Sequence, residues 1–179
     1  MSNIKDKPNR HSIRLREYDY SSPGWYYITI CTHQHACIFG NIKNGKMVLS
    51  PIGKIAQEYW VEIPDHFKHI ELDEFVVMPN HIHGIIIIND NRRDTACRVP
   101  TNQFGKPVPG SLPTIIRSYK SAVTKQINER RKRPGKKLWQ RNFYEHIIRN
   151  DKELPQIRKY IIDNPMKWQL DNEHPRHRR

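Results

Sequence analysis

The sequence predicts an α+β domain in which an antiparallel β-sheet carries helices on one face, ferredoxin-like or RRM-like in general shape. Strand-like and helix-like segments follow one another as strand, strand, helix, strand, strand, helix, with a further helix near the C-terminus. The turns between successive strands are short, which is typical of antiparallel pairing. The chain has 179 residues, which suffices for one domain with a core of its own, and no internal repeat is visible.

The first two elements are a strand and a hairpin. Residues 25–32 are aromatic and β-branched and follow the turn-forming pair Pro23-Gly24, so they predict a strand, which we expect to continue towards Phe39. The pair Asn44-Gly45 is typical of a tight hairpin turn and places a returning strand at 46–49.

A helix and a second hairpin come next. Ser50 and Pro51 suit the cap and first position of a helix, along which apolar residues recur at helical spacing: Ile52, Ile55, Ala56, Tyr59, Trp60 and Ile63. Residues 71–77 and 81–88 then read as two strands joined by the turn Met78-Pro79-Asn80. The second strand is apolar on both faces, so we expect it in the centre of the sheet.

The C-terminal half contains two helices. Residues 89–112 are polar and read as a long loop. A helix is predicted over 112–131 from the stripe Ile115, Ile116, Tyr119, Ala122, Val123 and Ile127, and residues 138–150 are expected to be irregular with a short strand. A last helix over 153–164 ends before Pro165, because the residue that precedes a proline is forced out of helical geometry.

Charge divides the chain into three parts: a basic N-terminal arm over 1–17, the domain over 18–168, and a basic tail over 169–179. The net charge of +13 indicates an anionic partner, with nucleic acid as the leading candidate. We expect a cytoplasmic protein with no membrane association, because no apolar stretch approaches the ~20 residues of a spanning helix and no signal peptide is visible. The three cysteines lack CxxC spacing, so neither a disulfide framework nor a zinc ribbon is predicted.

His81 and His83 are candidate metal ligands. Two residues apart on a strand, they share one face with Cα atoms about 6–7 Å apart, close enough to bind one ion. The spacing alone equally fits two partly exposed histidines at a strand start. A similar alternation, Cys31, His33, His35 and Cys37, is rejected as a zinc site, because the ends of an extended strand of that length lie about 20 Å apart.

Tyr160 and Asn164 supply matching chemistry on the last helix. Their i, i+4 spacing puts a phenol and an amide oxygen on one face. If Asn164 completes the metal site, Tyr160 lies beside the ion and can attack a bound phosphodiester as phenolate. Packing against the isoleucines around Tyr160 explains the spacing equally well. The other tyrosines considered, Tyr119 and Tyr144, are followed four residues later by apolar residues that cannot ligate.

Three segments carry a family resemblance. Residues 74–86, which include His81-Ile82-His83, are similar to the HUH segment of the single-tyrosine transposases of insertion sequences, a group that includes the REP-associated tyrosine transposases. Residues 138–149 resemble that family's Trp-Gln-Arg block, and residues 159–165 resemble the segment with its nucleophile. The resemblance runs from about Tyr18 to Trp168. It implies a metal-dependent enzyme that nicks and rejoins single-stranded DNA, usually at a hairpin, through a 5′-phosphotyrosine.

The resemblance also implies roles for individual residues. Carried across, His81 and His83 are metal ligands, Tyr160 is the nucleophile and Asn164 is the third ligand, where glutamine is commoner among insertion-sequence members. The implied ion is Mg²⁺ or Mn²⁺, whereas two imidazoles by themselves would also suit zinc.

The densest basic run is the candidate DNA contact. Charge for phosphates and aromatic surfaces for bases occur together in and just after it, the combination that single strands favour. The residues predicted to contact DNA are Arg130, Arg131, Lys132, Arg133, Lys136, Lys137, Trp139 and Arg141. A solvated surface run explains the charges alone equally well.

Two other functions remain open from the sequence. One is a catalytically silent module on the same scaffold that binds a DNA hairpin or RNA. The other is a hydrolytic zinc enzyme, ranked third because spacing places no carboxylate near the histidines. The chain could act as a monomer or as a homodimer, in which Tyr160 would serve the histidines of the partner.

Overall fold

A four-stranded antiparallel sheet forms the centre of the computed structural model, which describes residues 18–90 and 108–177. The strand order is β4-β5-β1-β6. The strands are β1 (Gly24–Cys31), β4 (Ile70–Val77), β5 (His81–Ile88) and β6 (Tyr144–Ile148). With a helical segment between β1 and β4 and a helix between β5 and β6, this is the split βαββαβ arrangement of ferredoxin-like domains. The predicted α+β class is confirmed, whereas the N-terminal arm and most of the predicted loop lie outside the described residues.

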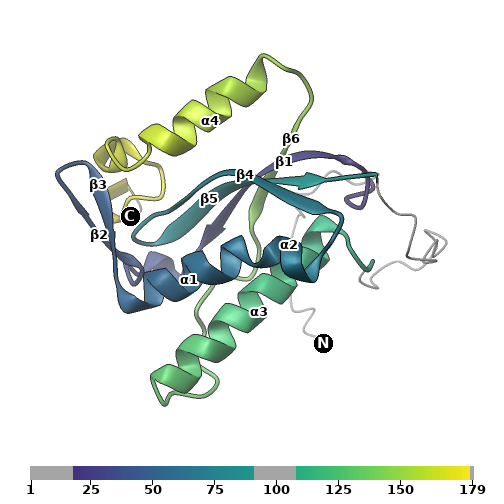
Figure 1. Ribbon diagram of the computed structural model, residues 1–179. Helices are drawn as coiled ribbons and strands as arrows, with labels where there is room; N and C mark the ends of the chain where they lie inside the picture. The colour runs from purple at the N-terminus through teal and green to yellow at the C-terminus, as the bar shows by residue number, and fades with distance from the viewer. Residues whose placement is uncertain (1–17, 91–107, 178–179) are drawn as a thin grey trace, which may run out of the picture.

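Helices lie on both faces of this sheet (Figure 1). The longer helices on one face are α1 (Pro51–Val61), followed by the short α2 (Ile63–His66), and α3 (Leu112–Arg130). Helix α4 (Glu153–Asp163) packs on the other face. The described residues also form the 3-10 turns η1 (His33–His35), η3 (Trp168–Leu170) and η4 (Pro175–His177). Within the described ranges, no helix is long and apolar enough to cross a membrane.

Alternation along β1 assigns its side chains to the two faces. Tyr26, Ile28 and Ile30 join the core beneath α1 and α3. The intervening residues, Tyr27, Thr29 and Cys31, share the opposite face, because successive strand residues point to opposite sides. The register pairs Thr29 with His83 and Cys31 with His81, so both histidines lie on the α4 face. The sheet thus separates a large apolar core from a polar face.

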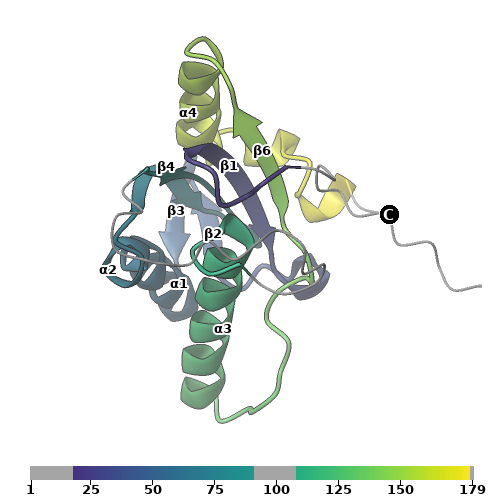
Figure 2. The same ribbon diagram turned by 90° about the vertical axis from the view of Figure 1, so that its right-hand side faces the viewer.

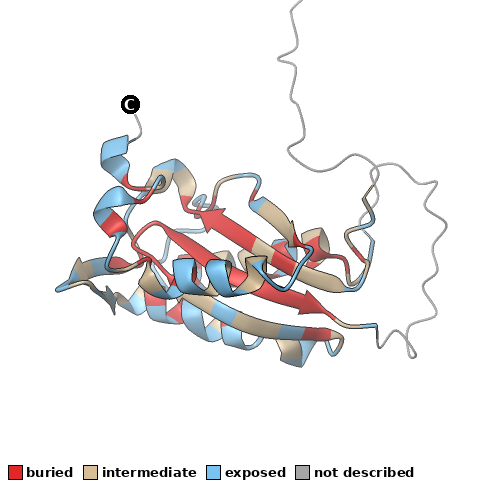
Figure 3. Ribbon diagram, turned by 90° about the horizontal axis from the view of Figure 1, so that it is seen from above, coloured by how far each residue is buried: buried red, intermediate tan, exposed pale blue. Residues whose placement is uncertain are grey.

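Strand β5 is buried along its whole length, as the red central arrow in Figure 3 shows. It pairs with β4 on one side and β1 on the other, as the apolar sequence of 81–88 predicted. The two histidines at its start are therefore held on a strand hydrogen-bonded on both sides, which makes their positions rigid.

Two departures from expectation follow the end of β1. The strand stops at Cys31 instead of continuing towards Phe39, and Gln34 and His35 both adopt left-handed backbone geometry, with φ of 56° and 51°. The predicted hairpin exists, with the Asn44-Gly45 turn, but β2 (Gly40–Lys43) and β3 (Lys46–Leu49) form a separate two-stranded sheet. The left-handed pair redirects the chain, a feature that alternation of residue types does not reveal.

The C-terminal tail is a second correction. The sequence placed residues 169–179 outside the domain, as a basic arm. In the structure Trp168 and Asp171 are 8 and 6 % exposed, and Asp171 lies against both histidines of β5. The described part of the tail is therefore part of the domain.

Gly84 is required by the packing of α1 on β5. A Cβ atom at this position would lie 2.5 Å from Cζ2 of the fully buried Trp60. We expect Gly84→Ala to lower the free energy of unfolding by about 1–3 kcal/mol, because the indole cannot retreat without disturbing the core. Urea denaturation measures this change. Val61→Ala on the exposed side of α1 is the control, with an expected change below about 0.5 kcal/mol; equal effects would show that the Trp60 contact is not the cause.

Candidate metal centre and nucleophile

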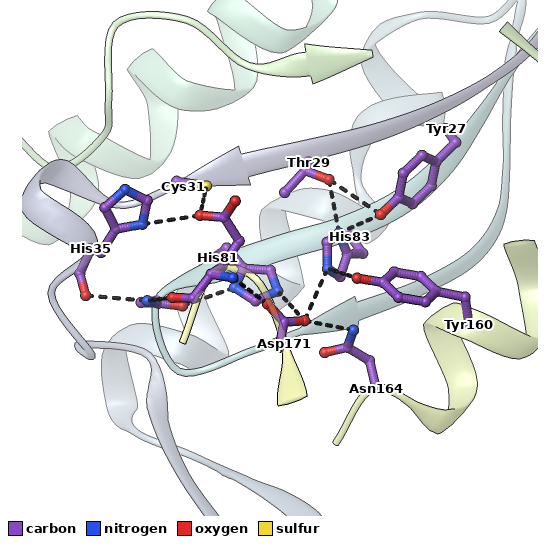
Figure 4. Close-up of polar contacts among 11 residues, drawn as sticks. Tyr27, Thr29, Cys31, His35, His81, His83, Tyr160, Asn164 and Asp171 are labelled. Carbon is purple, nitrogen blue, oxygen red and sulfur yellow. Dashed lines mark hydrogen bonds and ion pairs between the residues drawn. The ribbon is translucent and has the colours of Figure 1, made fainter. Parts of the chain in front are cut away.

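The two histidines of β5 meet at the start of that strand. His81 and His83 are 0 and 3 % exposed, and their ring centroids lie 4.3 Å apart. Figure 4 shows both rings on the α4 side of the sheet, with Asp171 between them and the end of α4. The alternation on a strand that the sequence indicated therefore does place both imidazoles at one point.

Asn80 sets the tautomer of His81. The amide nitrogen of Asn80 donates to the carbonyl oxygens of His35 and Glu173, at 3.2 and 2.7 Å. Its Oδ1 then faces Nδ1 of His81 at 2.8 Å and can only accept, so Nδ1 carries the proton. The lone pair is left on Nε2, the atom that points to Asp171. Such an outer hydrogen bond is how proteins orient a metal-binding imidazole.

His83 is held in the same manner by β1. Its Nδ1 lies 2.8 Å from the Tyr27 hydroxyl and 2.9 Å from Oγ1 of Thr29. Burial raises the pKa of Tyr27, so this phenol stays protonated. Each hydroxyl can accept a hydrogen bond from Nδ1–H, and Nε2 of His83 again faces Asp171 and α4.

Asp171 is the residue that sequence reasoning missed. Its Oδ2 lies 3.9 Å from Nε2 of His81 and 3.7 Å from Nε2 of His83. Two ligands of one ion, each at about 2.1 Å, lie roughly 3.0–3.4 Å apart. The two distances from the carboxylate to the imidazoles therefore need to shorten by well under 1 Å, and the three ligand atoms already lie within 4.8 Å of one another. Asp171 and Glu173 are the only acidic residues after residue 168. Two acidic residues in an otherwise basic tail are the sequence feature that could have identified Asp171 as a candidate ligand.

The charge of Asp171 is favoured at this point. Burial by itself would raise the pKa of its carboxyl group, but the neighbouring imidazoles of His83 and His81 hold that pKa well below its usual range. The carboxylate is thus ionised and able to ligate a cation.

Asn164 lies at the C-terminal cap of α4 and is 2 % exposed. Its Nδ2 donates to Oδ2 of Asp171 at 2.9 Å. Its Oδ1 is buried and has no hydrogen-bond partner among the described residues. A buried oxygen without a donor is costly unless a ligand or ion satisfies it. Asn164 therefore positions Asp171 directly and still offers an oxygen.

Tyr160 lies one helical turn before Asn164 and reaches the same point. Its hydroxyl is 3.5 Å from Nε2 of His83, and its side chain is 43 % exposed. Burial, reinforced by the nearby charge of Asp171, raises the pKa of Tyr160 to about 12, against lowering hydrogen bonds from Asn164 and Tyr27. The phenol is therefore protonated near neutral pH and accessible from solvent. Tyr119, by contrast, is buried and donates to the carbonyl oxygen of Ala56 at 2.8 Å, which is a packing role.

Comparison with known proteins shows which proteins this chain resembles. No protein-family model matches the chain. An uncharacterized protein of Haemophilus influenzae is 40 % identical over 168 residues, which cover 91 % of this chain and 92 % of that protein. A second protein of the same organism, described as "Putative REP-associated tyrosine transposase", is 25 % identical over 152 residues, 83 % of this chain and 74 % of its own length.

A solved structure agrees in fold. The REP-associated tyrosine transposase bound to a REP hairpin superposes with a TM-score of 0.56 and 19 % identity, over 90 % of this chain and 77 % of that one. The chain is thus similar in sequence to a putative REP-associated tyrosine transposase and shares the fold of a solved one. The resemblance read from the sequence is thereby confirmed.

An ion pair fixes α4 of this transposase relative on the sheet. Arg158, two residues before Tyr160, donates from Nε to Oδ1 of Asp73 on β4 at 2.9 Å, and its second nitrogen binds Oδ2. The guanidinium also lies 5.6 Å from the centroid of the Trp25 ring. A forked contact of this kind specifies orientation as well as proximity, so it sets the rotation of the helix that carries Tyr160.

The same ion pair gives a pH-dependent prediction. The hydrogen bonds from Arg158 lower the pKa of Asp73, so the pair stabilises the fold above the ordinary carboxyl pKa of about 3.9 and is lost as pH falls through the lowered value. We expect Asp73→Asn to cost about 1 kcal/mol at pH 7, and the difference from the parent to shrink as pH drops below about 4. Urea midpoints from pH 7 to pH 3 test this. Asp151→Asn, an exposed aspartate before α4, should show neither effect.

The predicted DNA contacts lie apart from α4. Figures 1 and 2 both show the C-terminal end of α3, where the basic run begins, on the opposite side of the molecule from α4. The charged members are all exposed: Arg130, Arg131, Lys132, Arg133, Lys136, Lys137 and Arg141. Trp139 is a correction, because it is 8 % exposed, packs on Phe39 and Tyr119, and donates from Nε1 to the Lys120 carbonyl oxygen. It is a core residue and presents no face for a base to stack on.

Proposed function

We propose that the protein is a metal-dependent single-stranded DNA endonuclease and strand transferase that nicks and rejoins DNA through a covalent phosphotyrosine. The observation that carries the proposal is the position of the Tyr160 hydroxyl, 3.5 Å from His83 and open to solvent, at a buried centre of two imidazoles and a carboxylate. All these groups come from one chain, which supports a site that is complete in a monomer.

The chemistry follows from the residues present. Tyr160 loses its proton and its oxygen forms a bond to phosphorus, while the bond from phosphorus to the 3′-oxygen breaks. The products are a 5′-phosphotyrosine and a free 3′-hydroxyl, which takes up a proton. Attack by a 3′-hydroxyl on the phosphotyrosine releases Tyr160 and rejoins a strand. The phosphotyrosine therefore retains the energy of the broken phosphodiester bond until the strand is rejoined.

His81, His83 and Asp171 would hold the ion, and the buried oxygen of Asn164 is available as a further ligand. When bound, a divalent cation neutralises the negative charge of the non-bridging phosphate oxygens and lowers the pKa of the groups near it. Two imidazoles with one carboxylate suit Mn²⁺ or zinc better than Mg²⁺, which prefers oxygen ligands and retained waters. We therefore favour Mn²⁺ over Mg²⁺ among the ions that the family resemblance implied.

The proposed substrate is a DNA hairpin with a single-stranded flank. The solved relative is bound to a REP hairpin. The net charge of +13 and the exposed basic run at the end of α3 suit phosphate contacts, which supply affinity without reading sequence. Because Tyr160 and the basic run lie on opposite sides, the substrate would have to extend across the molecule to reach both.

The test is a reaction with a 5′-labelled and, separately, a 3′-labelled DNA that carries a hairpin and a single-stranded flank. We expect a covalent adduct, resolved on a denaturing gel, that forms with Mn²⁺ and is absent with a chelator. The label on the 3′ side of the nick should remain with the protein, as a 5′-phosphotyrosine requires. Salt-sensitive binding without an adduct under any metal would overturn the proposal in favour of a catalytically silent nucleic-acid-binding module.

A further inference from the structure

A second group of metal-binding side chains lies beside the first. Sγ of Cys31 donates to Oε2 of Glu173 at 3.2 Å, and Nδ1 of His35 lies 3.1 Å from the same oxygen. Each side chain offers one ligand atom, and the three atoms lie within 4.8 Å of one another. Figure 4 shows Cys31 and His35 next to His81, on the side away from Tyr160.

The backbone brings these residues together by an unusual route. Cys31 ends β1, and the turn η1 returns the chain so that His35 faces back towards the strand end. That turn requires left-handed geometry at Gln34 and His35, two consecutive residues that are not glycine. Non-glycine residues adopt this geometry at a cost, and such strain is concentrated at functional sites. The sequence argument against a zinc site at Cys31 and His35 assumed an extended strand. The bend at Gln34 and His35 removes that assumption.

The distances and donor types fit zinc. Ligands around a tetrahedral zinc ion with one sulfur, one nitrogen and one oxygen lie roughly 3.3–3.6 Å apart, so the observed contacts need to open by only a few tenths of an ångström. Cys31 is 9 % exposed, and the side chains of His35 and Glu173 are 13 and 18 % exposed. The group is sheltered but accessible, which leaves room for a water as the fourth ligand.

An outer partner for the imidazole is also present. Gln140 of the Trp-Gln-Arg block contacts Nε2 of His35 through its side-chain amide. When Nδ1 ligates, the proton belongs on Nε2, and a half-turn of this amide presents Oε1 to accept it. This is the outer-shell hydrogen bond that metal-binding histidines commonly make.

We propose that Cys31, His35 and Glu173 form a second metal site, distinct from the one at His81 and His83, that takes Zn²⁺ and fastens the C-terminal segment to the end of β1. On binding, the thiol proton of Cys31 passes to solvent and the thiolate ligates the ion. The ligands come from segments 142 residues apart, so the ion acts as a cross-link between the sheet and the tail.

Two short connections link this second metal site to the centre at His81, His83 and Asp171. Glu173 is two residues from Asp171, and its backbone N–H donates to Oδ1 of Asp171 at 2.6 Å. Asn80 binds the carbonyl oxygens of both His35 and Glu173 while it accepts from His81. Zinc at the second site would therefore keep Asp171 against the two histidines. This consequence rests on the proposed function, whereas the zinc site itself does not.

Cobalt titration of the full-length protein, stripped of metal and kept reduced, tests the site. We expect one equivalent of Co²⁺ to produce a sulfur-to-cobalt charge-transfer band that Zn²⁺ abolishes. The Cys37→Ser/Cys97→Ser variant leaves Cys31 as the only cysteine of the chain and should keep the band. Cys31→Ser should remove it, and Glu173→Gln should weaken binding at least about tenfold.

Two outcomes separate this proposal from the catalytic one. The band should persist in a His81→Ala/His83→Ala variant. In that variant Zn²⁺ should slow hydrogen exchange over 168–174, and adding Glu173→Gln should remove the effect. Absence of the band in the parent, or its survival in Cys31→Ser, overturns the proposal whether or not DNA is nicked. An intact band with no DNA adduct overturns only the proposed function.

Discussion

Replacing Tyr160 by phenylalanine is expected to abolish the covalent protein–DNA adduct and to reduce nicking by at least about 1,000-fold. The phenolic oxygen is the only atom lost, so the centre formed by His81, His83 and Asp171 loses the nucleophile assigned to it. Stability should hardly change, since the side chain is 43 % exposed and the ring, which packs edge-on against Tyr27, is retained. Single-turnover rates on labelled hairpin DNA, together with urea denaturation, measure both quantities.

Tyr144→Phe is the matched control for this variant. Tyr144 is 52 % exposed and its ring also packs against Tyr27, yet it lies on β6 and no ligand-type residue follows it at helical spacing. Its replacement should leave the rate of adduct formation within about twofold of the parent. If Tyr160→Phe formed undiminished adduct, or if Tyr144→Phe lost it, the assignment of the nucleophile would be wrong.

Replacing Asp171 by asparagine is expected to weaken Mn²⁺ binding by about 100-fold or more and to lower the nicking rate at subsaturating metal by a similar factor. Loss of an outer-shell partner typically costs 10–100-fold in metal affinity, so loss of a direct ligand and its charge should cost at least as much. The fold should persist, because asparagine has nearly the same shape and replaces a buried carboxylate by a neutral group. Calorimetric titration with Mn²⁺ and rates across a metal series give the two values.

Asp163→Asn is the control for this change. Asp163 is the aspartate next to Asn164 on α4, but it pairs with Lys159 and Lys167 on the outer side of the helix. It should bind Mn²⁺ as the parent does. Faster nicking in Asp171→Asn with unchanged Mn²⁺ affinity would contradict the ligand role, and would indicate that the carboxylate obstructs the site instead.

The sequence was sufficient to predict the central sheet and to pair two residues of the candidate metal site, His81 and His83. Alternation and turn residues specified β4, β5 and the main helices closely, because these depend on local periodicity and on a few strong caps. Ser50, for example, caps α1 as expected, with its Oγ accepting from the N–H of Gly53 at 3.0 Å. His81 and His83 could be paired from spacing alone, since a strand places every second residue on one face.

Residues that meet through long-range contacts were not accessible in this way. Asp171 reaches the histidines only because the chain reverses after Pro165 and Trp168 packs near His81, with ring centroids 5.9 Å apart. No periodicity reports such a reversal. The same holds for Cys31 and His35, whose convergence depends on two left-handed residues. For Asn164, a predicted ligand, the structure adds a second role, because its amide holds Asp171 in place.

The most direct test of the central claim is to identify the residue that becomes linked to DNA. The adduct formed with Mn²⁺ and a hairpin substrate would be digested with protease and nuclease, and the modified peptide sequenced by tandem mass spectrometry. We predict a single nucleotide-bearing peptide, with the phosphate on the Tyr160 oxygen. A modification on any other residue, or no modified peptide from a reaction that has cleaved the DNA, would contradict the account.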